Sequence, residues 1–119
     1  MKSTIEQETG DQLEGRMGLF RIQNNIGIKA FTHKEYDKAL KFFNSALNLE
    51  PLNSGALLNK VQVYIKLLKI GNRSSKEECL INCIDTIRLL RNTQLSAEHQ
   101  SRYNKLKNQL QKIAPKSSF

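Results

Sequence analysis

Apolar side chains recur every three or four residues over most of the chain, which is the spacing of an amphipathic α-helix. The clearest stretch, residues 27–51, holds two such stripes that break around residues 32–34 and stop at Pro51. The second stripe consists of Tyr36, Ala39, Leu40, Phe43, Ala46 and Leu47. Because helices usually end before the residue that precedes a proline, we expect two short helices that pack together and need neighbours to bury their faces.

The first helix of this pair is expected to begin at about Glu14 and to continue through Gly18, which weakens the pattern locally. Its apolar positions are Met17, Phe20, Ile26, Ala30 and Phe31. Residues 1–13 are polar and without periodicity. We therefore expect residues 1–13 to be a flexible N-terminus.

Three more helices are expected downstream, each preceded by a residue that can cap it. The candidate caps are Asn53 or Ser54, then Ser74 or Ser75 (with Ser74 and Glu77 at the spacing of a capping box), then Ser96. Stop signals follow at Gly71–Asn72 and at Pro115. The three apolar stripes are Leu57, Val61, Tyr64, Ile65 and Leu68; Cys79, Leu80, Cys83, Ile84, Ile87 and Leu90; and Tyr103, Leu106, Leu110 and Ile113. The pattern predicts an all-α protein of five helices, whose last helix has the single narrow stripe of a terminal cap.

The length of 119 residues suits one domain, and its net charge of +8 is unevenly distributed. Basic and acidic side chains balance over residues 1–59, so the whole net charge comes from residues 60–119. This asymmetry favours an acidic partner for the second half, either an acidic peptide or, less specifically, nucleic acid. The absence of a long apolar run or an apolar leader favours the cytoplasm or the nucleus.

No arrangement of residues typical of an enzyme is found. There is no glycine-rich phosphate loop and no nucleophile paired with a histidine at a motif spacing, so neither an enzyme nor a cofactor is expected. Cys79 and Cys83 lie four apart, but a zinc site needs about four ligands, and His33 and His99 lie elsewhere. Packing of two small thiols in the core is the favoured interpretation.

An internal repeat becomes visible when the chain is shifted against itself by about 34 residues, the period of the tetratricopeptide repeat (TPR). The shift brings Gly27 onto Val61, Ala30 onto Tyr64 and Phe31 onto Ile65. The first copy resembles the TPR signature at Gly27, Ala30, Tyr36, Ala39, Phe43, Ala46 and Pro51. In the second copy Cys79, Cys83 and Thr86 take the signature places after a displacement of about six residues, so residues 69–76 look like an insertion.

The resemblance implies two TPR helix-turn-helix repeats and a capping helix, stacked as a right-handed superhelix with a concave groove. The expected limits are about 20–53 for repeat 1, 54–92 for repeat 2 and 96–114 for the capping helix, within a domain of residues 14–114 and before a short tail of residues 115–119. An unrelated helical bundle is the alternative. Two repeats are fewer than the three or more that such arrays usually need, so the fifth helix is expected to stand in for the third.

Among TPR proteins, the chain resembles the small fungal cofactors of the ninety-kilodalton heat-shock chaperone. The local matches are FxxQxxxG (residues 20–27), NK (59–60), IKL (65–67), AEH (97–99) and KL (105–106). Those cofactors work with a PIH-domain partner and a pair of AAA+ ATPases in the assembly of box C/D small nucleolar ribonucleoproteins. The resemblance therefore implies a co-chaperone that links the chaperone to an assembly machinery.

Two polar stripes would face the groove if the first helix of each repeat lines it. They are Asn59, Gln62 and Lys66 on the third helix, and Lys105, Gln109 and Lys112 on the fifth. TPR domains that bind chaperones hold the terminal carboxylate and aspartate of an acidic peptide with two lysines, two asparagines and an arginine. Physically, a carboxylate in a groove needs several charge-assisted donors.

By position, Asn59 matches the asparagine of the second repeat and Lys105 the lysine of the capping helix. The chain departs from the clamp at three places, where it has Asn24, Ile28 and Gln109. The loss of two cations and one donor would cost several kcal/mol at about 1.5 to 3 kcal/mol for each charged hydrogen bond. Asn24 or Asn25, together with Lys66, could partly substitute for them.

The leading hypothesis is a non-enzymatic TPR adaptor that binds the acidic C-terminal peptide of a heat-shock chaperone. The alternative is a TPR scaffold with a degenerate clamp, in which Ile28 and Phe31 receive an apolar helix or tail of another partner. A basic nucleic-acid-binding helical protein is a third reading, disfavoured because aromatics are not interleaved with its basic residues.

Overall fold

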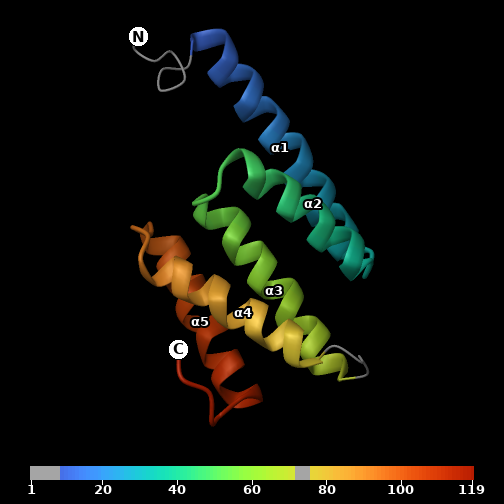
Figure 1. Cartoon of the computed structure of the whole chain (residues 1–119), viewed down its shortest axis with the longest axis vertical. Helices are drawn as coiled ribbons and strands as arrows, with labels where there is room; N and C mark the ends of the chain where they lie inside the picture. The colour runs from blue at the N-terminus through green and yellow to red at the C-terminus, as the bar shows by residue number, and fades with distance from the viewer. Residues whose placement is uncertain (1–8, 72–75) are drawn as a thin grey trace.

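The computed structural model describes residues 9–71 and 76–119, and these residues form five α-helices and no strand. The helices are α1 (Gly10–Thr32), α2 (Tyr36–Leu49), α3 (Ser54–Ile70), α4 (Lys76–Arg91) and α5 (Ala97–Ile113). Figure 1 shows them stacked along the long axis of a body of 50 × 29 × 26 Å, with α1 and α2 at one end and α5 toward the other. The prediction of an all-α protein is confirmed. None of the described helices is long and apolar enough to cross a membrane.

The first helix begins earlier than expected, at Gly10 and not near Glu14. Thr9 caps it: the Gln12 amide donates to Thr9 Oγ1 at 3.1 Å, and the Thr9 amide donates to Gln12 Oε1 at 3.0 Å. This reciprocal capping box satisfies amides that would otherwise lack partners at the helix start. Residues 10–13, which were expected to belong to a flexible N-terminus, are thus part of α1, and residues 1–8 lie outside the described part of the chain.

Three other helix ends follow local signals of the sequence. Asn53 Oδ1 accepts from the Ala56 amide at 3.0 Å and so caps α3, and Ser96 Oγ accepts from the His99 amide at 3.1 Å and caps α5. Gly71 ends α3 in the left-handed region at φ 69°, where glycine has no Cβ penalty. The capping box expected at Ser74 and the turn between α3 and α4 lie outside the described residues.

The core is organised around α3, which is buried on most of its faces. It packs against α1, α2, α4 and α5. Its buried side chains include the whole expected stripe and four more, and they are Ala56, Leu57, Leu58, Val61, Val63, Tyr64, Ile65, Leu67 and Leu68. The pair α1 and α2 is therefore one flank of the molecule, and α3 is its centre.

The contact between α1 and α2 depends on small residues facing one aromatic ring. Ala30, Ala39 and Ala46 are buried there, and Phe43 is only 1% exposed. A Cβ atom at Gly27 would lie 2.5 Å from Cε1 of Phe43, far inside van der Waals contact. Gly27 therefore lets the ring of Phe43 lie directly on the backbone of α1.

The chain after α5 folds back onto the body. Arg88 of α4 donates through Nη2 to the carbonyl oxygen of Ser118 at 3.0 Å, and Phe119 packs, half-buried, against the core. Cys79 and Cys83 on α4 are buried, and the Cys79 thiol donates to the carbonyl oxygen of Tyr64 at 3.7 Å. Burial raises the pKa of the Cys83 thiol to about 12, so it stays protonated at neutral pH.

Candidate functional site

Side chains from α1, α3 and α5 meet on one face of the molecule in a chain of hydrogen bonds. Asn59 of α3 donates through Nδ2 to Asn24 Oδ1 of α1 at 3.2 Å. Arg102 of α5 donates through Nη2 to Asn59 Oδ1 at 2.7 Å and to Gln62 Oε1 at 2.6 Å. These bonds connect three helices that are not consecutive in the sequence.

Arg102 is the charged centre of this network. Its guanidinium is partly buried, and burial is the main influence on its pKa, which is lowered from the ordinary value; the nearby charge of Glu98 acts in the opposite direction. The Asn59 and Gln62 oxygens that accept from Arg102 belong to neutral amides. Binding of an anionic acceptor stabilises a partly desolvated cation with neutral partners more than it stabilises a fully hydrated cation.

A hollow of about 300 Å³ opens between α3 and α5 beside Arg102, and we call it the cationic hollow. It is lined by Gln62, Ile65, Lys66, Lys69, Arg102, Lys105, Leu106 and Gln109. Lys69 donates through Nζ to Gln109 Oε1 at 3.3 Å across it. None of these lining side chains is a carboxylate, so four cations surround one small space.

A second hollow, of about 220 Å³, lies next to it, between α1 and α3, and we call it the apolar hollow. It is lined by Ile28, Phe31, Phe43, Asn59, Gln62 and Arg102. Gln62 and Arg102 border both hollows, so the two are parts of one groove. The groove has an apolar wall on α1 and cations on α3 and α5.

Most of the candidate residues named from the sequence line the groove. Asn24 belongs to the hydrogen-bond network, Ile28 and Asn59 line the apolar hollow, and the rest line the cationic hollow: Gln62, Lys66, Lys105 and Gln109. Lys112, the last residue of the expected α5 stripe, does not line either hollow.

Sequence reasoning missed Arg102, Lys69 and Phe43 as groove residues. Arg102 precedes Lys105 by one helical turn, and Lys69 follows Lys66 by one turn, so extending each polar stripe by a turn would have found them. In the structure the α5 cation that contacts Asn59 is Arg102. Lys105, matched to the capping-helix lysine by resemblance, lies one turn further along.

The arrangement offers hydrogen-bond donors and positive charge. The described residues contain no group of three or more histidine, cysteine, aspartate or glutamate side chains that could hold a metal ion. Comparison with protein-family models, with curated proteins and with solved structures gives no match for the chain. The function is therefore argued from the chemistry of the groove.

Proposed function

We propose that the protein is a non-enzymatic adaptor of the TPR type whose groove binds an acidic C-terminal peptide. The observation that carries this proposal is the cationic hollow, where Lys66, Lys69, Arg102 and Lys105 surround about 300 Å³ of space. A terminal carboxylate together with a neighbouring acidic side chain complements such a site in charge and in the number of acceptors.

The groove geometry suits a peptide with a particular order of side chains. An acidic end placed in the cationic hollow leaves the preceding side chain beside Ile28, Phe31 and Phe43 of the apolar hollow. A carboxylate at Arg102 would replace the amide oxygens of Asn59 and Gln62 and free those amides to turn their N–H groups to the ligand. The resting network thus holds Arg102 in place for a stronger acceptor.

The acidic tail of a heat-shock chaperone is the partner we propose for this site. The support is the sequence resemblance to the small TPR cofactors of the ninety-kilodalton chaperone, together with the charge of the hollow. In this proposal the adaptor connects the chaperone to an assembly complex through a second partner of the PIH-domain type, and it works in the cytoplasm or the nucleus.

The test is isothermal titration calorimetry with a peptide that ends in the acidic tail of the chaperone. We expect binding that weakens as salt is raised, because exposed charges are screened. Lys105→Ala should weaken it by about 3- to 10-fold, less than the full worth of a charged hydrogen bond because Lys105 is exposed. Lys107→Ala is the matched control, since Lys107 lies over the ring of Tyr103 and outside the groove.

Two results would contradict the proposal. No heat of binding at millimolar peptide would rule out the chaperone tail as the ligand. Equal weakening by Lys105→Ala and Lys107→Ala would show that the ligand senses net charge alone, as a nucleic acid bound nonspecifically would. A peptide with an amidated C-terminus should bind more weakly than the free acid, because it lacks the terminal charge.

The apolar hollow favours a second candidate, in which an uncharged apolar segment of another protein occupies the groove. Ile28 is 43% exposed, so its side chain is accessible to such a segment. Binding of this kind would withstand high salt and Lys105→Ala, but would be lost in Ile28→Asp. A co-purified partner that has no acidic terminus would favour this candidate over the first.

A further inference from the structure

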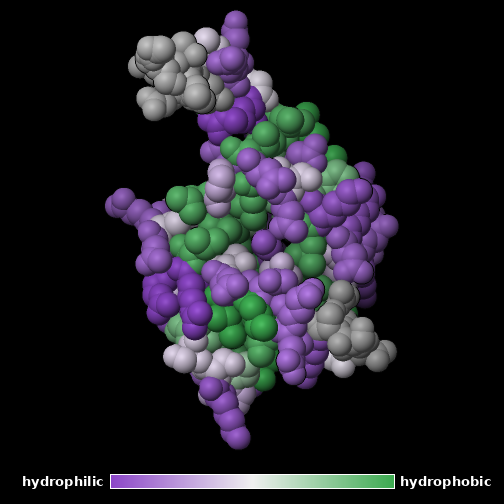
Figure 2. All heavy atoms as spheres, in the orientation of Figure 1, coloured by the Kyte–Doolittle hydropathy of each residue, from purple (hydrophilic) through white to green (hydrophobic). Residues whose placement is uncertain are grey.

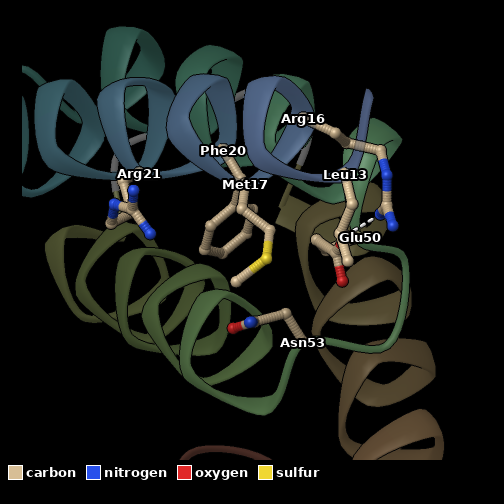
Figure 3. Close-up of a pocket in the computed structure, with 7 residues that line it drawn as sticks. All are labelled: Leu13, Arg16, Met17, Phe20, Arg21, Glu50 and Asn53. Atoms are coloured by element: carbon tan, nitrogen blue, oxygen red, sulfur yellow. Dashed lines mark ion pairs between the residues drawn. The ribbon is translucent and has the colours of Figure 1, made fainter. Parts of the chain in front are cut away.

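A third hollow, of about 250 Å³, lies beside the first half of α1, and we call it the N-terminal hollow. Figure 3 shows Met17 and Phe20 pointing from α1 into the space in front of Asn53, at the start of α3. At the outer side Arg16 pairs with Glu50 and also donates to the carbonyl oxygen of Leu49 at 2.9 Å. This pairing connects α1 to the end of α2 and forms one wall of the hollow.

The N-terminal hollow is open, and Leu13, Met17 and Phe20 form the apolar part of its lining. Leu13 is 40% and Met17 43% exposed, although both are large hydrophobic side chains on its lining. In Figure 2 the outer end of α1 is mostly hydrophilic, and hydrophobic atoms appear further along the helix, where it approaches α2. Exposed apolar side chains that lie together around one hollow are typical of a binding surface.

The N-terminal hollow lies on the same side of α1 as the groove. Leu13, Met17, Phe20, Asn24 and Ile28 follow one another at intervals of three or four residues, which places them in one row along the helix. Asn24 in this row bonds to Asn59, and Ile28 lines the apolar hollow. The row therefore connects the N-terminal hollow to the apolar hollow.

We propose that the N-terminal hollow is an additional subsite of the same groove, which takes a large apolar side chain of the acidic C-terminal peptide. This inference rests on the proposed function. At 1.5 Å per residue, Met17 and Ile28 lie about 16 Å apart along α1. An extended peptide covers about 3.3 Å per residue, so the second apolar side chain belongs about five residues before the first.

The charges around the hollow fit this occupant. Arg21 lines the hollow on the side toward the rest of the groove, where the acidic spacer of such a peptide would pass. The carboxylate of Glu50, the only acidic side chain on the lining, already pairs with Arg16. An acidic peptide therefore meets a positive charge along its path, and no unpaired carboxylate of the lining repels it.

The experiment uses the full chain and three synthetic peptides with free C-termini. The short probe is Leu-Glu-Asp-Asp. The long probe adds Leu-Ser-Glu-Ser-Glu before it, and the control probe has serine in place of the first leucine of the long probe. We expect the long probe to bind about 5- to 30-fold more tightly than the control probe, because an open hollow buries only part of a leucine side chain.

Two variants locate this gain. Met17→Glu places a charge in the hollow and should remove the difference between the long and control probes while leaving the short probe unchanged. Leu19→Glu is the matched control, since Leu19 is 46% exposed and lies about 200° around α1 from Met17. Both positions are exposed, so both variants should fold, which their circular dichroism checks.

The outcomes separate this inference from the proposed function. Binding of the short probe without any gain from the added leucine, or a gain that persists in Met17→Glu, would overturn the additional subsite and leave the proposed function standing. No binding of any probe at millimolar concentration would overturn both. A gain seen only after deletion of residues 1–8, or a dimer that Met17→Glu abolishes, would show a different occupant and overturn the inference.

Discussion

Gly27→Ala is the sharpest test of how α1 and α2 pack. The new methyl carbon would lie 2.5 and 2.6 Å from Cε1 and Cδ1 of Phe43, and both groups are held in place, one by the helix backbone and the other by the core. Real Cβ atoms do not approach that closely, so either the ring or the whole of α2 has to move. Since Phe43 lines the apolar hollow, the change also reaches the groove.

The expected size of the effect comes from two opposing terms. Overpacking a well-filled core costs about 1 to 3 kcal/mol. Replacing a helical glycine by alanine gains about 0.5 to 1 kcal/mol, because the unfolded chain loses freedom. Gly18→Ala on the same helix has the second term alone, since a Cβ at Gly18 meets nothing within 4 Å. The difference in unfolding free energy between the two variants should therefore be about 1 to 3 kcal/mol.

The assay is urea unfolding followed by far-ultraviolet circular dichroism. Gly18→Ala should raise the midpoint, and Gly27→Ala should lie clearly below it. Phe43→Leu in the Gly27→Ala background should recover part of the difference, because a leucine side chain leaves room for the methyl group. Equal stabilisation by the two alanines would refute the close contact between Gly27 and Phe43.

Two further predictions concern titration and capping. Burial, with a smaller contribution from neighbouring groups, raises the pKa values of Tyr64 and Cys83 to about 12. The unfolded chain releases these two protons from about pH 9, whereas the folded chain keeps them. The free energy of unfolding should therefore be full below pH 9 and fall toward pH 12, by up to about 1.4 kcal/mol per pH unit for each group. Urea midpoints against pH measure this fall, and an unchanged slope in Cys83→Ala would contradict it. Thr9→Ala removes a cap worth about 0.5 to 2 kcal/mol and should speed amide exchange in the first turns of α1 by about 2- to 30-fold without moving the urea midpoint. Thr32→Ala, at the other end of α1, is its control, and unchanged exchange in Thr9→Ala would exclude a stabilising cap.

The helix ends that were predicted correctly are those set by neighbouring residues. Pro51 stops a helix through its own ring, Gly71 allows a left-handed turn, and Asn53 and Ser96 accept from amides only three residues away. Such signals need no tertiary contact, so the sequence alone reveals them.

The central position of α3 was harder to predict, because burial depends on what surrounds a helix. A single stripe suggested a helix with one packed face, yet Leu58, Val63 and Leu67 are buried as well. Likewise, nothing local predicts that Phe119 returns to the core or that Arg88 bonds to Ser118. Contacts between residues far apart in sequence decide these features.

The missed start of α1 has a functional consequence. Thr9 and Gln12 form a capping box of a known pattern, but it precedes a glycine-containing stretch with little apolar periodicity. The polar composition of residues 1–13 therefore favoured a flexible segment over a helix start. A helix that began at Glu14 would have left Leu13 outside the helical row that lines the N-terminal hollow. The cap and the subsite are thus linked: if the first turns of α1 fray, the outer end of the groove loses its wall, while the cationic hollow between α3 and α5 is unaffected. Thr9→Ala should therefore reduce the affinity gained from an upstream leucine and spare the binding of a short acidic peptide.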